Sequence, residues 1–291
     1  MDKKTITKQI SDLELLQSLT SAYAKISSTR MKKTRSSVLL SRDFLVEISA
    51  IFGEIQASYQ REVLKLARTK GFKKGEKITL LAHNGKTVAV FMSANTGFYG
   101  DLTKKVFELF LKDVIEKKVE ATIVGNLGVS LFTERAPNIP YSYFDLPDYG
   151  MDRDKMAELI KHLVEYEEIH IYYGKFKSVI SQNADLLTIS SKVAVTNQAN
   201  STITKYLFEP SLEEILMFFE TEMFSSIFEQ AVSESQLAKF ASRMIAMDAA
   251  SEKIKQSLTS TKIDNLRLMH NLDNKKQLEY LSSVVSGGQF V

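Results

Sequence analysis

The sequence has 291 residues, a formal net charge of +3 and no cysteine. This length suits one large domain or two ordinary ones, and 44% hydrophobic residues are typical of a globular protein with a substantial core. The lack of cysteine excludes disulfide bonds, thiolate metal sites and a cysteine nucleophile. The small net charge argues against a nucleic-acid-binding domain.

The amino terminus, MDKKTITKQISDLELL, has no uninterrupted apolar run, so it is not predicted to be a signal or transit peptide. No stretch approaches eighteen consecutive apolar residues, so no membrane-spanning helix is expected. We therefore predict a cytoplasmic protein, or one side of a larger assembly.

Glycine and proline are distributed unevenly. Neither occurs before Gly53 or between Pro210 and Gly287, whereas ten of the twelve glycines fall between Gly53 and Gly174. Because Gly costs about 1 kcal/mol and Pro about 3 kcal/mol inside a helix, both ends of the chain are predicted to be long helices.

Apolar residues recur every three or four positions at both ends, as on one face of a helix. The amino-terminal stripe consists of Ile6, Ile10, Leu13, Leu16, Leu19, Tyr23 and Ile26. The carboxyl-terminal stripe consists of Leu237, Phe240, Met244, Met247, Ile254 and Leu258, and resumes at Leu278, Leu281 and Val284. Stripes this narrow predict that the two ends pair as an antiparallel two-stranded coiled coil.

The middle of the chain alternates between strand and helix patterns, which predicts a small, partly parallel α/β domain. The runs KITLLA and TVAVFMS, on either side of Asn84-Gly85, predict a β-hairpin. The other predicted elements are helices at 102–117, near 129–134 and at 154–166, and strands at 120–125, 168–173 and within 178–195.

The last helix has a predicted start at Ser211, an N-cap with Glu214 three residues later, which is the pattern of a capping box. We therefore predict three segments. Residues 1–72 form one coiled-coil helix, residues 73–208 an inserted α/β domain, and residues 209–291 the second coiled-coil helix.

Five motifs, in order along essentially the whole chain, are similar to those of one family. The amino end carries Ile6, Ile10, Thr20, Ala22 and Met31-Lys32 at the spacing of that family's first helix. SANTGFYGDL, ATIVGNLGVSLF and YLFEPSLEEIL match its glycine-containing loop, third strand and lead-in to the last helix, and ASRMIAMDAASEKI resembles its carboxyl-terminal signature. The family is the γ subunit of rotary F-type ATP synthases.

The resemblance implies an α/β fold in which a long antiparallel two-helix coiled coil from both termini carries an inserted Rossmann-like domain. It also implies a non-catalytic central rotor subunit of a bacterial, proton-translocating complex. The expected partners are three pairs of α and β subunits, with ε-like and membrane-ring subunits, on the inner face of the cell membrane. No cofactor, metal or nucleic acid is expected.

The residues expected to contact the catalytic ring lie in both terminal helices. They are Ile10, Leu13, Tyr23, Arg30, Lys32, Lys33, Arg243, Met244, Met247, Thr261 and Asn265. Alanine and methionine in the last helix would give a slim surface with adaptable contacts. The candidates for the foot of the rotor are Thr96, Gly97 and Gly100.

The chain also departs from the family pattern. Thr96 and Asp101 replace an arginine and a second glycine of the family's loop, and Ser18 and Ser21 replace lysines of its first helix. Such departures are typical of a divergent relative, such as the F-type-like ATPases of mycoplasmas. In this alternative the rotor drives a mechanical load other than proton pumping.

Several candidate sites also have an ordinary structural interpretation. The basic cluster STRMKKTR is either a solvated helix face or an electrostatic bearing. Thr261 and Asn265 interrupt the apolar stripe, so they either face solvent or make polar sliding contacts. The glycines of TGFYGD and GNLG are typical of tight turns, because no phosphate-loop lysine follows them. The four histidines are too scattered for a metal site.

Two alternatives belong to other classes of protein. A self-contained coiled-coil scaffold would show no affinity for a hexameric ATPase ring. A nucleotide-dependent enzyme built on the α/β insert would bind nucleotide by itself, although the chain lacks a full dinucleotide-binding fingerprint.

Overall fold

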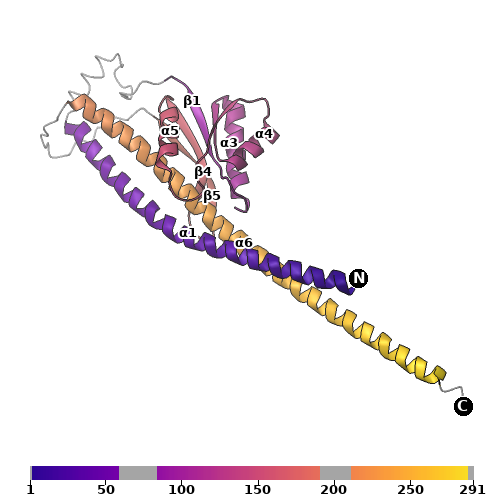
Figure 1. Cartoon of the computed structure of the whole chain (residues 1–291). Coiled ribbons are helices and arrows are strands. Elements are labelled where there is room, and N and C mark those ends of the chain that lie inside the picture. The colour runs from indigo at the N-terminus through magenta and orange to yellow at the C-terminus, as the bar shows by residue number, and fades with distance from the viewer. Residues whose placement is uncertain (1, 59–83, 191–210, 288–291) are drawn as a thin grey trace. The chain divides into compact units, whose positions relative to one another are not determined.

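The computed structural model describes residues 2–58, 84–190 and 211–287 (Figure 1). Its contacts divide the chain into two compact units. The coil unit contains Met1–Ser27 and Arg243–Val291, and the sheet unit contains Ser28–Ser242. The predicted segment boundaries at 72/73 and 208/209 fall outside the described residues.

Both ends of the chain form the long helices that the glycine and proline distribution predicted. Helix α1 spans Lys3–Ser58 and helix α6 spans Leu212–Gly287. The backbone N–H of Glu214 donates to Ser211 Oγ at 3.2 Å, which confirms Ser211 as the N-cap of α6.

Strands and helices alternate between the two long helices, as predicted. They are β1 (Thr87–Met92), α3 (Leu102–Lys117), β2 (Glu120–Val124), α4 (Asn126–Arg135), β3 (Tyr141–Phe144), α5 (Arg153–Leu163), β4 (Glu168–Phe176) and β5 (Gln182–Ser190). Strand β3 was not predicted from the sequence, because it is only four residues long and an alternating pattern does not stand out over so short a run.

These strands form one five-stranded sheet in the order β3-β2-β1-β4-β5. The first four strands are parallel to one another, and β5 runs antiparallel to β4. The chain builds the sheet outward from β1 on one side, through β2 and β3, and then returns to the other side of β1 with β4. The carboxyl ends of β1 and β4 are therefore the topological switch point, where open α/β sheets usually bind ligands.

The hairpin predicted for β1 is wrong. Val90 of β1 lies opposite Thr122 of β2 and Ile171 of β4, so parallel neighbours bond both edges of β1. Asn84 and Gly85 do form a turn: Asn84 Oδ1 accepts from the Lys86 N–H at 2.8 Å, and Gly85 has a φ of 71°. The run KITLLA lies outside the described residues. A turn signal fixes the local backbone and leaves the choice of strand partner open.

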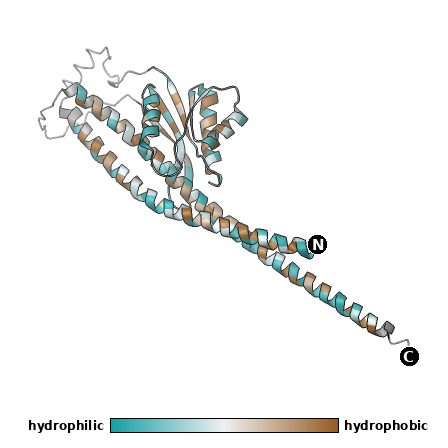
Figure 2. Cartoon of the chain, viewed as in Figure 1, coloured by the Kyte–Doolittle hydropathy of each residue, from teal (hydrophilic) through white to brown (hydrophobic). Residues whose placement is uncertain are grey.

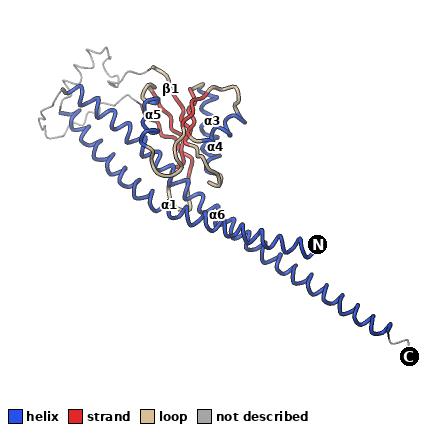
Figure 3. Tube along the Cα trace, in the orientation of Figure 1, coloured by secondary structure: helices blue, strands red, loops and turns tan. Residues whose placement is uncertain are grey.

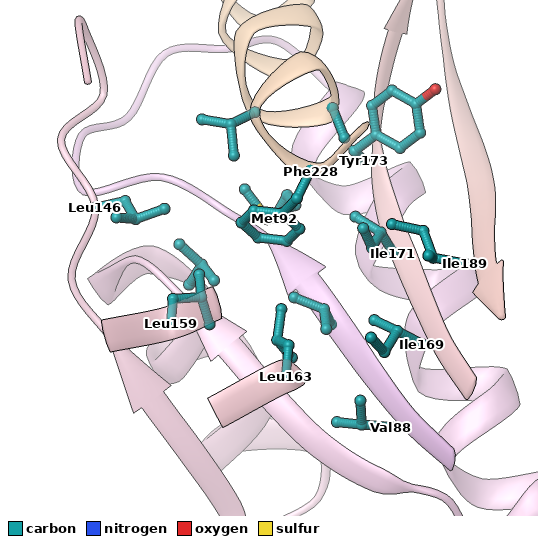
Figure 4. Close-up of a cluster of buried hydrophobic side chains, with 14 of the residues drawn as sticks. Val88, Met92, Leu146, Leu159, Leu163, Ile169, Ile171, Tyr173, Ile189 and Phe228 are labelled. Atoms are coloured by element: carbon teal, nitrogen blue, oxygen red, sulfur yellow. The ribbon is translucent and has the colours of Figure 1, made fainter. Parts of the chain in front are cut away.

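Helices cover both faces of the sheet within the sheet unit (Figure 3). One face packs against α5 and the first part of α6, where Leu159, Leu163 and Phe228 meet Val88 and Ile171 (Figure 4). The opposite face packs against α3 and α4 through a second cluster rich in aromatic side chains. Burial on both faces explains why β1 reads as the continuous apolar run TVAVFM.

The least exposed positions of α1 alternate by steps of four and three from Ile6 to Ile48, which is the heptad spacing of a coiled coil. We call these positions the seam. They are residues 6, 10, 13, 17, 20, 24, 27, 31, 34, 38, 41, 45 and 48.

The predicted amino-terminal stripe follows the seam only as far as Leu13. Leu16, Leu19, Tyr23 and Ile26 are 41–47% exposed, and Gln17, Thr20, Ala24 and Ser27 take the inward positions. Two consecutive steps of three, from 13 to 16 and 19, turn about 120° away from the original face. The prediction was wrong here because it followed hydrophobicity, whereas small and polar residues form this part of the seam.

Candidate functional site

The coil unit contains most of the residues that the sequence singled out for partner contacts. In α1, Ile10 and Leu13 are half-buried on the seam, and Tyr23 lies outside it. Glu14 Oε1 accepts from Lys262 Nζ at 2.8 Å, which joins α1 to α6 in antiparallel register.

In α6, Arg243 and Met247 are buried and Met244 is half-buried. Thr261 and Asn265 are half-buried at heptad spacing from Leu258, and the Asn265 Oδ1 atom is inaccessible to solvent. These two residues therefore lie on the same partly buried side of α6 as Leu258 and do not turn toward solvent.

Large apolar side chains also lie on the outside of the coil unit. Leu15, Leu16, Leu19, Tyr23 and Ile26 are 41–61% exposed, and their positions fall within about 100° around the helix axis. We call this group the outer stripe. Brown residues recur along both long helices in Figure 2.

The last described turns of α6 are also exposed and apolar in part. Leu278, Leu281 and Val284 are 63–72% exposed, although the sequence pattern predicted that they continue the buried stripe. With the outer stripe, these are eight large apolar side chains of the coil unit that are at least 41% exposed. Clustered exposed apolar side chains are typical of an interaction surface.

In contrast to the exposed end of α6, a segment of this helix in the sheet unit has all of its side chains buried. Every residue from Ala231 to Ser242 is buried, including the polar residues Glu234, Gln236 and Lys239. A buried polar side chain is tolerated when it has a hydrogen-bonding partner, so the partners of these residues show what the helix is bonded to.

Three of the buried side chains donate to loops at the carboxyl edge of the sheet. In the β1–α3 loop (residues 93–101), the Ser93 carbonyl accepts from Lys239 Nζ at 2.6 Å, and the Tyr99 carbonyl accepts from Ser242 Oγ at 2.7 Å. In the β3–α5 loop (residues 145–152), two carbonyls accept from the Gln236 side chain. They are those of Pro147, at 3.1 Å, and Gly150, at 2.8 Å.

Asn95 ties the two loops together. Its side-chain amide donates to Asp145 Oδ1 at 2.8 Å and to the Leu146 carbonyl at 2.9 Å, and its Oδ1 accepts from the Asn126 N–H at 2.8 Å. Asp148 accepts from the backbone N–H groups of Asn95 and Thr96. The hydrogen bonds from Lys155 and then from Asn95 lower the pKa of the Asp145 carboxyl.

Arg30 contacts the same region from α1. Its guanidinium lies 5.0 Å from the ring centre of Tyr149 and 5.8 Å from that of Phe240. Of the basic cluster, Arg30 is thus engaged with aromatic rings of its own chain, whereas Lys32, Lys33 and Arg35 are exposed.

Three of the four glycines in the two predicted loop motifs have structural roles, and Gly97 is the exception. Gly125 has a φ of 95°, and a Cβ atom there would lie 2.8 Å from the backbone of Ala94. A Cβ at Gly128 would lie 2.7 Å from Ser93 Cβ. Gly100 has a φ of 58°, and Gly97 has open space around it. The features of Gly100, Gly125 and Gly128 agree with the tight turns expected from the sequence and add close backbone approach at Gly125 and Gly128.

The position of α6 bears on the alternative of a nucleotide-dependent enzyme. The switch point between β1 and β4 is where such an enzyme would bind its ligand. Here Lys239 and Ser242 of α6 donate hydrogen bonds to the loop that follows β1, and Ala238 packs in the core cluster that includes Leu102. The loop at the switch point is therefore bonded to the protein's own helix.

Four residues of this hydrogen-bond network were not predicted from the sequence: Asn95, Asp148, Gln236 and Lys239. Asn95 adjoins the predicted Thr96, which was the only hint. Gln236 and Lys239 carry no local signal, because a polar residue in a long helix is normally assigned to a solvated face.

The part of the chain that the structure describes contains no helix with an apolar stretch of the length needed to span a bilayer. The same residues include no group of acidic or histidine side chains placed to hold a metal ion.

Comparison with known proteins matches this architecture. The family model described as ATP synthase matches residues 2–268. A protein named ATP synthase gamma chain from Ruthia magnifica subsp. Calyptogena magnifica is 24% identical, with 99% of each chain covered. One of the same name from Mesoplasma florum is 25% identical, with 96% of this chain and 95% of the relative covered.

Two solved structures share the fold. The central stalk of the Tetrahymena thermophila mitochondrial ATP synthase superposes with a TM-score of 0.55 at 18% identity, covering 80% of this chain and 99% of that one. A chain of the Euglena gracilis mitochondrial ATP synthase superposes with a TM-score of 0.53 at 15% identity, covering 91% and 97%.

The chain therefore belongs to the ATP synthase family. Within the family, its full-length similarity to proteins named ATP synthase gamma chain identifies it as a gamma-type rotor subunit, and the solved structures share its fold.

Proposed function

We propose that the coil unit turns inside a ring of three pairs of α- and β-type ATPase subunits and makes their catalytic sites unequal. The observation that carries this proposal is the outer stripe. The seam of α1 is already paired with α6, so the outer stripe and the exposed end of α6 have no role in holding the coil together. Large apolar side chains that cluster on the surface, as these do, are typical of a protein interface.

The outer stripe can supply the free energy that such a rotor needs. Shifting a catalytic subunit from 1:99 to 99:1 between two conformations requires about 5.5 kcal/mol of differential contact. Fully burying a large apolar side chain is worth about 1.5–3 kcal/mol, so covering five that are half exposed contributes on the order of 5 kcal/mol. Because the stripe occupies one side of the helix, only one subunit pair would contact it at a time.

Rotation and nucleotide binding are then coupled in both directions. If the outer stripe favours one conformation of a catalytic pair, a nucleotide that favours the same conformation draws the stripe toward that pair. The rotor supplies no reacting group. Its contribution is the asymmetry of its surface and the stiffness of two long helices.

The basic residues Lys32, Lys33 and Arg35 have a second proposed role in the same complex. They are exposed on one segment of α1, where they can meet acidic loops of the catalytic subunits. Charge pairs at the rim of an interface tune the rate of approach and its salt dependence more than affinity. Arg30 contributes less to this contact because its guanidinium stacks on Tyr149 and Phe240.

The β1–α3 loop, with Thr96, Gly97 and Gly100, is proposed as part of the foot that faces the load. Thr96 Oγ1 donates to Asp148 Oδ2 at 2.5 Å, which holds the loop in place beside the exposed Phe98 ring. We propose that the load is an ε-like subunit and a proton-conducting ring, which would place the complex on the inner face of the cell membrane. A different mechanical load is the alternative.

Co-expression tests the proposal. The chain is produced with the α- and β-type ATPase subunits encoded in the same genome, and the complex is purified through a tag on the β-type subunit. The expected result is one copy of this chain for every three pairs, measured by native mass spectrometry. Recovery of α/β rings that never contain the chain would overturn the rotor proposal. Adding the ε-like subunit and the membrane ring to the co-expression then tests whether the β1–α3 loop faces that load.

A further inference from the structure

The segment of α6 from Ala231 to Ser242 is unusual because it is buried on all sides and yet strongly polar. An apolar helix would fill the same space. Hydrophobic contact is not directional, however, so the rotation of an apolar helix would be held by the packing of its side chains alone. Buried donors behave differently, because each one that leaves its acceptor is left unpaired in a site without water.

Three donors of this segment bond to the insert. Gln236, Lys239 and Ser242 follow one another at intervals of three residues, so they fan across about 120° of the helix surface. Their acceptors are backbone carbonyls at Ser93, Tyr99, Pro147 and Gly150, which belong to the two loops at the carboxyl edge of the sheet. A backbone carbonyl cannot swing to follow a moving donor as a flexible side chain can.

The acceptor loops are themselves held to the sheet. Ser93 follows β1 directly, and its N–H donates to the Val124 carbonyl of β2 at 2.9 Å. Asn95 and Asp148 bond the β1–α3 loop to the β3–α5 loop. A force on α6 is therefore transmitted through these loops to β1 and β2, two inner strands of the sheet.

We propose that Gln236, Lys239 and Ser242 form a rotational lock that keeps α6 from turning within the insert while torque passes between them. This inference rests on the rotor role and assigns these three side chains a positioning function within it. Turning the helix by one residue moves each donor by about 100° around the axis. Such a slip would unpair all three donors at once, and the lysine would carry its charge away from its acceptor.

Lys239 is the central member of the lock. Its long stem reaches the Ser93 carbonyl from inside the protein, and its ammonium is the only charged donor of the three. Lys239→Met keeps the apolar stem and removes the donor. Lys239→Arg keeps a charged donor of similar reach and is the rescue variant. Arg42→Met is the matched control, because it removes a charged partner of α6 that belongs to α1 and not to the insert.

Hydrogen exchange on the full-length chain gives the first test. Lys239→Met is expected to speed exchange in the β1–α3 loop and at residues 236–242 by about tenfold or more, with α3 and α5 unchanged. Lys239→Arg is expected to stay within about threefold of the natural chain, and Arg42→Met to leave the β1–α3 loop unchanged. Exchange in that loop that is the same in Lys239→Met and in the natural chain would overturn the lock.

Rotation under load gives the second test. The chain has no cysteine, so Lys104→Cys on α3 provides a single attachment point for a bead on the insert of the assembled complex. Lys239→Met is expected to keep unloaded ATP hydrolysis within about twofold of the natural complex and to slow rotation of a large bead several-fold. Lys239→Arg is expected to restore the loaded speed.

The two possible failures are distinguishable. If the natural chain does not assemble with α/β rings, the rotor role fails before any variant is compared. If it assembles and Lys239→Met turns large and small beads as the natural complex does, the lock fails and the rotor role stands. An equal fall in hydrolysis and in loaded rotation would also count against the lock, because it would show a general loss of structure.

Discussion

Arg42 Nη2 of α1 lies 2.6 Å from Glu234 Oε1 of α6, and the Glu234 side chain is almost completely buried. Arg42 lies 28 residues after Glu14, and Glu234 lies 28 residues before Lys262, the partner of Glu14. Twenty-eight residues are four heptads. The two ion pairs, one in each unit, are therefore separated by the same number of residues along α1 and along α6, in opposite chain directions.

Breaking the Arg42–Glu234 pair is expected to destabilise the chain more than breaking the Glu14–Lys262 pair. Arg42→Met leaves a buried carboxylate without its partner and should lower the free energy of unfolding by about 1–3 kcal/mol. Lys262→Met removes an exposed partner and should cost about 0–0.5 kcal/mol. Denaturant unfolding of both variants measures the difference. Equal losses would show that Glu234 is solvated.

Met247→Glu tests the buried side of α6 in the coil unit. Met247 is buried, so an unpaired carboxylate there should cost about 2–4 kcal/mol and weaken assembly with partner subunits. Ala249→Glu places the same charge on a neighbouring exposed position and should change stability by less than about 0.5 kcal/mol. Thermal unfolding of the two variants provides the comparison, and a neutral effect of Met247→Glu would place that residue on an exposed face.

Leu19→Glu tests the outer stripe. Because Leu19 is about half exposed and lies off the seam, the free energy of unfolding should change by no more than about 0.5 kcal/mol. Recovery of the chain with α- and β-type subunits should fall several-fold, because the charge would be covered in the complex. Ser18→Glu, an exposed position outside the stripe, is the control. Normal assembly of Leu19→Glu would show that this face meets no partner.

Gly125→Ala and Gly97→Ala should differ sharply, although both alter predicted loop motifs. At Gly125 the new methyl would overlap the Ala94 backbone on a residue with positive φ, at a cost of about 2–4 kcal/mol. At Gly97 the space is open, so the effect should lie within about 0.5 kcal/mol. Urea unfolding distinguishes them. A severe effect at Gly97 would indicate a contact that the structure does not show.

Acid should weaken the loops at the carboxyl edge of the sheet through Asp145. Its pKa is lowered by hydrogen bonds from Lys155 and Asn95, so the folded state binds this proton less readily than the unfolded state does. The stabilisation is complete above the unfolded pKa of about 3.9 and is lost as pH falls through the lower folded value.

The variant Asp145→Asn should be less stable than the natural chain at neutral pH and lose less stability below about pH 4. Unfolding curves across that range measure both effects. The exposed Asp248→Asn is the control, and parallel acid profiles for the natural chain and Asp145→Asn would contradict the assignment.

The sequence alone determined the features that arise from local backbone preferences. A chain without glycine or proline at either end forms long helices, Ser211 caps the second of them, and alternating periodicities mark the strands and helices of the insert. Each of these signals acts within a few residues, so no knowledge of the partner segment is needed.

The tertiary structure decided which segments pair and which polar groups they bury. Small and polar residues such as Ala24 and Ser27 lie on the seam, whereas Leu19 lies outside it. When two helices pair in a given register, the residues at the facing heptad positions are buried even if they are not hydrophobic. For the same reason, β1 takes two parallel neighbours in place of a hairpin, and Lys239 finds its acceptor 146 residues away in the sequence. Contacts between distant segments depend on complementary surfaces that no local pattern encodes.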